Sequence, residues 1–311
     1  MAKKVLPMPL LRINSGPLHP APADGRALIP ALDRALAALQ PGDPIVVLLH
    51  GLRFSPFISA HDPHGHIFGM DPQPHCQKAL SWPVALGYDG TSQGLCIPFA
   101  WDGALKLGEG YRRAGQAGRQ LAGLLTQIAA LSPNPVHLFA HSLGARVALR
   151  ALALTHAPVA RAVLLNPAEF HIPAAQALSS PVGQRAEILH VSASENLAFD
   201  ALFQLAAPRR RRTDIALGLR IPKAPNWHRL AISQTTTRAR LATLGYPITA
   251  PTARLCHWST YTRPGMFALY RALLCTPNPL PLSLLAPPGF SVPGKLPPEA
   301  PNPTACTAAR H

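Results

Sequence analysis

The chain has 311 residues, 48% of them hydrophobic, and this length is enough for one large domain with a full buried core. Its net charge of +15 reflects a shortage of acids, since only 14 residues are Asp or Glu, rather than a dense basic face. No run of 18 apolar residues lacks charge or proline, and the five scattered cysteines contain no C-x-x-C pair, so we expect no transmembrane helix, disulfide framework or zinc ribbon, and a cytoplasmic location.

The first elements predicted are an arm, a helix and a buried strand. Residues 1–25 are rich in proline and predict an extended arm or a first edge strand, without the apolar core of a signal peptide. Residues 26–39 have leucines at helical spacing, and Gln-Pro-Gly-Asp-Pro at 40–44 ends that helix. Residues 45–51 are apolar without alternation and end in His-Gly, which predicts a parallel strand buried on both faces.

A long polar segment rich in His, Pro and Gly follows over residues 53–93. An excursion of this length is usually functional or covers a site. It contains three histidines and an aspartate within His61–His66, with His75 and Cys76 nearby, and these are metal-ligand types. Their spacing is too tight for one rigid site and the prolines indicate turns, so we expect a loop that lines or covers the active site and binds no metal.

Strand and helix patterns alternate from residue 94 onwards. Residues 94–101, 162–165 and 188–193 are expected to be further strands, and residues 111–131 a long helix with its leucines on one side. This alternation predicts an α/β protein with a mostly parallel central sheet and helices on both faces. The proline-rich residues 276–311 predict a tail that is disordered or loosely draped.

The most informative motif is Ala140-x-Ser142-x-Gly144. An apolar strand pattern leads into it from Val136, and a helical pattern of small and apolar residues follows it directly. A serine at the apex of a strand, a sharp turn and a helix is a nucleophile elbow, where small neighbours permit a strained backbone and close packing of the helix on the strand. Alanine replaces the usual first glycine and still meets the demand for a small side chain. Ser142 is therefore the predicted nucleophile of a serine hydrolase.

The elbow, together with the His50-Gly51 pair after the early strand, resembles the α/β-hydrolase superfamily. The resemblance covers about residues 26–275 and implies an α/β-hydrolase fold with a lid-like insert, and a serine esterase that needs no cofactor or metal. It implies an oxyanion hole of backbone N–H groups, one from Leu143 and one from Leu52 or Arg53. It also implies that the catalytic acid and then the histidine follow the serine along the chain.

His257 is the general base that this resemblance implies. It follows the short run Arg254-Leu255-Cys256 and precedes an apolar helix pattern, which is the last-strand, loop, last-helix position where the superfamily carries its base. The other histidines between the serine and the chain end fit that position less well; these are His156, His171, His190 and His228.

Two residues are the main candidates for the acid. Glu195 lies just past the strand predicted at 188–193, and Asp200 follows it, although Asp200 is alternatively the cap of a short helix over residues 201–205. Glu169, after the preceding strand, is a third candidate. The superfamily's commonest aspartate spacing falls near Asn196 or Leu197, neither of which is acidic, so the sequence departs from the family pattern at this point and leaves the acid open.

One basic cluster stands out, the four consecutive arginines Arg209–Arg212. Such a run can bind nucleic acid or anionic lipid. Aromatic residues for base stacking are absent around it, so we expect a solvated loop and no specific nucleic-acid partner.

These features predict a hydrolase domain at 26–275, with inserts at about 53–93 and 206–250, that cleaves a carboxylic ester or thioester of a small-molecule substrate. The second insert joins the acid to His257 and is the expected specificity lid, with Trp227 and residues 230–244 on its apolar face. The alternative is a catalytically inactive hydrolase-fold protein that binds an anionic partner, which the missing aspartate and the positive charge support.

Overall fold

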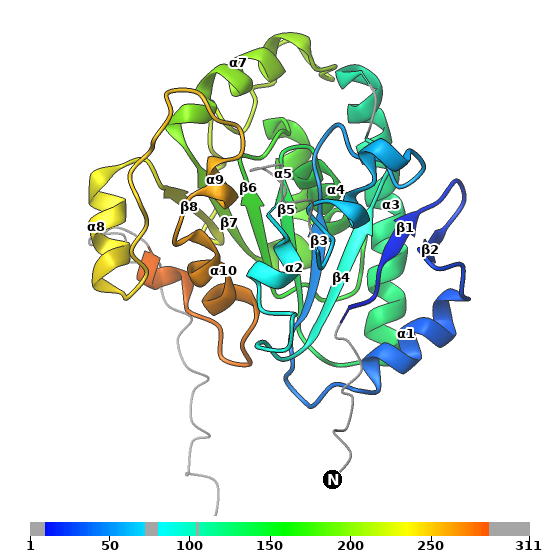
Figure 1. The fold of residues 1–311 in the computed structure, drawn as a ribbon. Coiled ribbons are helices and arrows are strands. Elements are labelled where there is room, and N and C mark those ends of the chain that lie inside the picture. The colour runs from blue at the N-terminus through cyan, green and yellow to red at the C-terminus, as the bar shows by residue number, and fades with distance from the viewer. Residues whose placement is uncertain (1–9, 72–79, 104–105, 286–311) are drawn as a thin grey trace, which may run out of the picture.

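The computed structural model describes residues 10–71, 80–103 and 106–285, which are built around one eight-stranded sheet with the order β2-β1-β4-β3-β5-β6-β7-β8 (Figure 1). Every neighbouring pair is parallel except β1 and β2, which confirms the mostly parallel sheet predicted from the alternating patterns. The strands are β1 (Ile13–Ser15), β2 (Pro20–Pro22), β3 (Ile45–Leu49), β4 (Leu95–Ala100), β5 (Val136–His141), β6 (Arg161–Leu165), β7 (Glu187–Ser192) and β8 (Trp227–Ala231).

The central strands are buried along their whole length because helices cover both faces of the sheet. All residues of β3, β4, β5 and β6 are buried, which explains their apolar runs without alternation. The register pairs Leu49 with Ala140 and His141 with Leu165, so neighbouring strands end almost level with one another. The loops after β3, β5, β6 and β7 therefore meet at one edge of the sheet, where ligands bind in open α/β sheets.

Helices lie on both faces of the sheet, as the alternating patterns predicted (Figure 1). Side chains of α1, α3 and α4 join the core on one face, and side chains of α2, α9 and α10 join the core on the other. The α-helices are α1 (Leu28–Leu36), α2 (Trp82–Ala85), α3 (Leu107–Leu131), α4 (Gly144–Leu152), α5 (His171–Ser179), α6 (Pro181–Arg185), α7 (Leu197–Ala206), α8 (Thr235–Thr243), α9 (Ser259–Thr262) and α10 (Met266–Leu274). Four 3₁₀ turns are described: Ser59–His61, Pro63–Gly65, Ser194–Asn196 and Leu282–Leu285.

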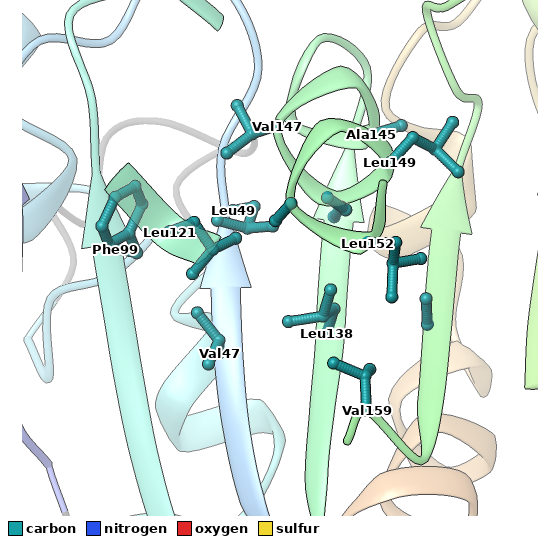
Figure 2. Close-up of a cluster of buried hydrophobic side chains, with 14 of the residues drawn as sticks. Val47, Leu49, Phe99, Leu121, Leu138, Ala145, Val147, Leu149, Leu152 and Val159 are labelled. Atoms are coloured by element: carbon teal, nitrogen blue, oxygen red, sulfur yellow. The ribbon is translucent and has the colours of Figure 1, made fainter. Parts of the chain in front are cut away.

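The core beneath α4 holds the candidate nucleophile's strand and helix in place. Val47 and Leu49 of β3 point to the same side as Leu138 of β5, because alternate residues of a strand share a face (Figure 2). Leu149 and Leu152 of α4 pack on that side, and all five residues are at most 1% exposed. The turn between β5 and α4 is thus fixed by a packed core at both ends.

Three expectations are corrected by the structure. Trp227 is buried in β8, so the segment predicted as a lid over 206–250 contains the last strand of the sheet. Only Trp227 and Leu230 of this edge strand are buried, and it lacks the apolar run used to find the inner strands. Residues 254–256 form no strand. Helix α7 begins at Leu197 rather than 201, so Asp200 lies within its first turn and caps nothing.

The structure describes part of the N-terminal segment, and the predicted C-terminal tail only up to residue 285. The proline-rich segment at the N-terminus supplies β1 and β2, which extend the sheet beside β4, in keeping with the expected edge strand. His75, Cys76 and the predicted tail beyond residue 285 lie outside the described residues.

Candidate active site

Ser142 occupies the sharp turn between β5 and α4. Its backbone has φ of 55°, the left-handed region that side chains other than glycine rarely adopt. The turn is held by its own amide, which donates to Leu165 O at 3.0 Å, and by its carbonyl, which accepts from Ala168 N at 3.0 Å. The strand, strained turn and helix predicted around this serine are therefore present, and the serine is 6% exposed.

Two glycines allow the end of β3 to approach the turn closely. A Cβ atom on Gly144 would lie 2.4 Å from Leu49 O and 2.7 Å from His50 O. A Cβ atom on Gly51 would lie 2.9 Å from the Cβ of Ser142. Because only hydrogen fits at both positions, the His-Gly pair and the elbow are in backbone contact.

Backbone strain gathers at this edge of the sheet. The non-glycine residues with positive φ among the described residues are Arg53, Ser142 and Asn166, at 74°, 55° and 41°, and they follow β3, β5 and β6. Such strain persists only where the surrounding structure holds it, and it clusters at functional sites.

The backbone donors expected for an oxyanion hole differ in availability. Arg53 N donates to Gly103 O at 2.7 Å, so that amide is already used. Within the described residues, the amides of Leu52 and Leu143 make no such bond. Their side chains converge, because a Cβ atom on Gly110 of α3 would meet the Cδ1 of Leu52 at 2.4 Å and the Cδ1 of Leu143 at 3.7 Å. Of the two alternatives after His50-Gly51, the geometry favours Leu52.

His257 lies beside the elbow and is anchored through its main chain. Its carbonyl oxygen accepts hydrogen bonds from His141 Nε2 and from Asn166 Nδ2, both at 3.0 Å. The rings of His141 and His257 are 4.6 Å apart. In the described residues the Ser142 hydroxyl forms no hydrogen bond with His257, and such bonds are often long in ligand-free sites and tighten when substrate binds.

The partner of the imidazole is an amide, not a carboxylate. His257 Nδ1 lies 2.6 Å from Asn196 Oδ1, and because a carbonyl oxygen only accepts, the neutral ring carries its proton on Nδ1. Asn196 Nδ2 in turn donates to Asp200 Oδ1 at 2.9 Å. Of the two carboxylates expected there, Asp200 therefore reaches His257 only through Asn196.

The side chains of this relay are buried, which changes their ionisation. Burial raises the pKa of Asp200 to about 6, against the opposing effect of the hydrogen bond from Asn196. Its carboxylate packs against Gly218, where a Cβ atom would lie 2.1 Å from the carboxyl carbon. Burial, and secondarily the neighbouring His141, lowers the pKa of His257 well below its usual value, so the ring is neutral at pH 7 and Nε2 can accept a proton.

Glu195 points away from the imidazole. Its carboxylate pairs with the buried guanidinium of Arg263 and accepts hydrogen bonds from the hydroxyls of Ser233 and Ser194. Burial alone would raise the pKa of Glu195, but the Ser233 bond and the Arg263 charge hold it below its usual value. The glutamate favoured by its sequence position thus ties β7 to the segment before α10.

Glu169 is also engaged elsewhere. It accepts from Tyr111 OH at 2.6 Å and from Arg146 Nη1 at 2.6 Å, linking α3, α4 and the loop after β6. Asn196 is the residue that sequence reasoning missed. The superfamily spacing falls near Asn196 or Leu197, and because neither side chain is acidic, neither was a candidate for the acid.

Among the described residues, no group of three or more His, Cys, Asp or Glu side chains gathers in a way that could hold a metal ion. None of the described helices combines the length and the hydropathy needed to cross a membrane.

Comparison with known proteins agrees with this architecture. The profile of the alpha/beta hydrolase family matches residues 46–302, which is most of the chain and includes the elbow, Asn196 and His257. None of the curated proteins matches the sequence.

Proposed function

Because this chain belongs to the alpha/beta hydrolase family, we propose that it is a serine hydrolase that cleaves the acyl bond of a small-molecule carboxylic ester or thioester. The observation that carries the proposal is the strained backbone of Ser142 at the apex of the turn between β5 and α4, next to a neutral, anchored histidine. Strain of this kind is maintained against a cost of about 1–3 kcal/mol, and holding a nucleophile at the sheet edge beside its base accounts for it.

Ser142 and His257 carry the chemistry in this proposal. The Ser142 hydroxyl oxygen bonds to the acyl carbon while its proton passes to His257 Nε2. The amides of Leu143 and Leu52 stabilise the negative charge on the acyl oxygen. His257 then gives the proton to the departing alcohol or thiol, and a water molecule, deprotonated by the same nitrogen, hydrolyses the acyl-serine.

Asn196 takes the orienting position that a carboxylate holds in most serine triads. Its amide oxygen holds the proton of His257 on Nδ1, which leaves Nε2 free to act as the base. An asparagine serves this purpose in Cys-His-Asn proteases. The negative charge that favours the imidazolium comes from Asp200, one hydrogen bond further away.

A serine-directed fluorophosphonate probe tests the nucleophile. We expect the purified protein to be labelled at Ser142, and Ser142→Ala to lose both labelling and ester turnover, the latter by roughly 10⁶-fold as for triad serines. Ser259→Ala is a matched control, because both serines are 6% exposed. Labelling that survives in Ser142→Ala and disappears in Ser259→Ala would reject the assignment.

The orienting role of Asn196 needs separate variants. Asn196→Leu keeps the branched shape of the side chain and removes the acceptor, so kcat should fall by about 10²–10⁴-fold. The exchange Asn196→Asp/Asp200→Asn moves the carboxylate next to His257 and should restore turnover at least to that of the unchanged protein. Full activity of Asn196→Leu, or an inactive but folded exchange variant, would exclude this arrangement.

The inactive anion-binding protein is the rival function. Among the described residues no carboxylate is hydrogen-bonded to the His257 ring, and this and the exposed arginines favour the rival. Failure of Ser142 to react with the probe, in a protein that melts cooperatively, would decide for the rival.

A further inference from the structure

The outer face of α7 is apolar throughout. Three leucines of this face, Leu197, Leu202 and Leu205, are 54%, 59% and 77% exposed. With 3.6 residues per turn, all the exposed positions of α7 fall on one side of the helix, and none of them is polar; the remaining ones are Ala198, Ala201 and Ala206. Single exposed leucines are ordinary, whereas a whole exposed helix face without a polar side chain marks an interaction surface.

The inner face of α7 is fastened to the domain, so the outer face cannot turn inward. Phe203 packs with Phe170, their rings 4.9 Å apart. Gln204 donates to Asp214 O at 3.1 Å and accepts from Ala216 N at 2.6 Å. In Figure 1, α7 lies at the top of the molecule, at its outer rim.

The arginine run Arg209–Arg212 follows directly after α7. Three of its members, Arg210, Arg211 and Arg212, are exposed. In the part of the chain that the structure describes, the run forms no ion pair with a carboxylate.

The run continues a positive region on the neighbouring helices. Arg150 of α4 crosses α3 at Gly118, where a Cβ atom would lie 2.6 Å from the Arg150 Cβ. Burial, and then the guanidiniums of Arg119, Arg146 and Arg210, lowers the pKa of Arg150, while Glu169, which pairs with Arg146, opposes this shift. Guanidiniums from α3, α4 and the segment after α7 therefore lie near one another, with Glu169 as the carboxylate among them.

We propose that the outer face of α7 and the run Arg209–Arg212 together dock the protein on an anionic lipid membrane. A helix that lies in the membrane interface buries its apolar face at the boundary of headgroups and acyl chains, while adjacent arginines bind the anionic headgroups. A nucleic acid would engage the arginines and leave the leucines in water. A second copy of the chain would cover the leucines and bring two arginine runs together.

The same helix links this surface to the candidate active site. Asn196 immediately precedes α7, and the ring of Phe199 lies 4.8 Å from that of His257. Docking through α7 therefore holds the candidate active site close to the lipid. The membrane proposal does not depend on hydrolase activity, because vesicle binding is measured without substrate.

Flotation of the full chain with vesicles tests the surface. We expect binding to vesicles of phosphatidylcholine mixed with phosphatidylglycerol, weak binding to phosphatidylcholine alone, and loss of the difference at high salt. Replacing Arg210, Arg211 and Arg212 by alanine should weaken binding by about a hundredfold. Leu202→Ser/Leu205→Ser should weaken it by at least about tenfold, to mixed and neutral vesicles alike.

Matched controls separate this surface from general charge and hydrophobicity. Leu18→Ser changes a leucine that is 86% exposed in the turn between β1 and β2, and should bind like the unchanged protein. Replacing Arg34, Arg185 and Lys223 by alanine removes the same charge from other exposed positions and should weaken binding far less.

Three outcomes would overturn the proposal. The first is no flotation with mixed vesicles at low salt. The second is equal weakening by the control and test variants. The third is another occupant: a dimer that Leu202→Ser/Leu205→Ser dissociates, or a nucleic-acid complex that the arginine replacements abolish, in a protein that does not bind vesicles.

Discussion

At the residue scale, the proposed site divides between Asn196 and Asp200 two tasks that one carboxylate usually performs. The amide oxygen of Asn196 accepts from His257, while the charge resides on Asp200. Asp200 is 9% exposed, and its carboxylate accepts a hydrogen bond from the same amide. Because Asp200 is buried next to an uncharged partner, its ionisation is costly, and the cost is visible in its raised pKa. The site should therefore respond to pH through a residue that never touches the substrate.

The pH dependence of catalysis is the first consequence. In our proposal ionised Asp200 supports the imidazolium, so kcat/KM should rise with an apparent pKa near the value of about 6 that burial gives this carboxyl. Asp200→Asn removes that inflection. The profile should then follow His257, whose pKa burial lowers well below its ordinary value. A pH–rate profile of both proteins measures this, and an unchanged inflection in Asp200→Asn would assign it to another group.

The pH dependence of stability is the second consequence. The carboxyl of Asp200 binds its proton more tightly in the folded protein, with a pKa of about 6, than in the unfolded chain at 3.8, so the folded state loses stability as pH rises between these values. The loss is on the order of 3 kcal/mol for a difference of about two pKa units. Relative to Asp200→Asn, the unchanged protein should become less stable from pH 4 to pH 7 in urea denaturation. A constant difference would mean that the carboxyl titrates normally.

At the scale of elements, the elbow depends on contact between the backbones of β3 and α4. Gly144 faces the carbonyls of Leu49 and His50 so closely that no Cβ atom fits. Backbone atoms cannot move aside as the end of a side chain can, so this contact sets the relative position of the His-Gly pair and the nucleophile turn.

Adding one methyl group at this contact should be costly. We expect Gly144→Ala to lower the free energy of unfolding by about 1–3 kcal/mol and to reduce ester turnover, because the strand end must shift. Gly123→Ala is the control: this glycine lies in α3 with no atom within 4 Å of an added Cβ, so the change should stabilise by about 0.5–1 kcal/mol. Thermal and urea denaturation of both variants would check this, and equal effects would show that the contact is unimportant.

At the scale of the whole molecule, a buried arginine joins the sheet to the last helix. Arg161 of β6 is 3% exposed and donates through Nη1 to Leu273 O at 2.7 Å and Leu280 O at 3.0 Å. It also donates through Nη2 to Glu187 Oε2 at 2.5 Å. The two bonds to carbonyl oxygens connect residues more than a hundred positions apart and close α10 onto the domain.

Loss of this link should destabilise the protein. Arg161→Met leaves two carbonyls without their donor, and we expect the free energy of unfolding to fall by about 2–4 kcal/mol. Glu187→Gln tests the ion pair alone and should cost less than about 1 kcal/mol, since the glutamate side chain is 43% exposed. If both variants lost the same amount in urea denaturation, the ion pair rather than the carbonyl bonds would be the stabilising contact.

Local patterns in the sequence were enough for the sheet class and the elbow. The apolar runs of β3, β5 and β6 report burial on both faces, and Ser142 between a strand pattern and a helix pattern reports the sharp turn. These patterns can be recognised in a single sequence because each depends on residues that are close along the chain.

The partners of the site were decided only by the tertiary structure. Glu195 pairs with Arg263, 68 residues away, and Asn196 meets His257, 61 residues away. Spacing along the chain cannot show which of two adjacent side chains faces the imidazole, because the 3₁₀ turn before α7 buries both and points one towards His257 and the other towards Arg263. The edge strand β8 was missed for a related reason: only Trp227 and Leu230 of its five residues are buried, and its pairing with β7 gives it the strand conformation.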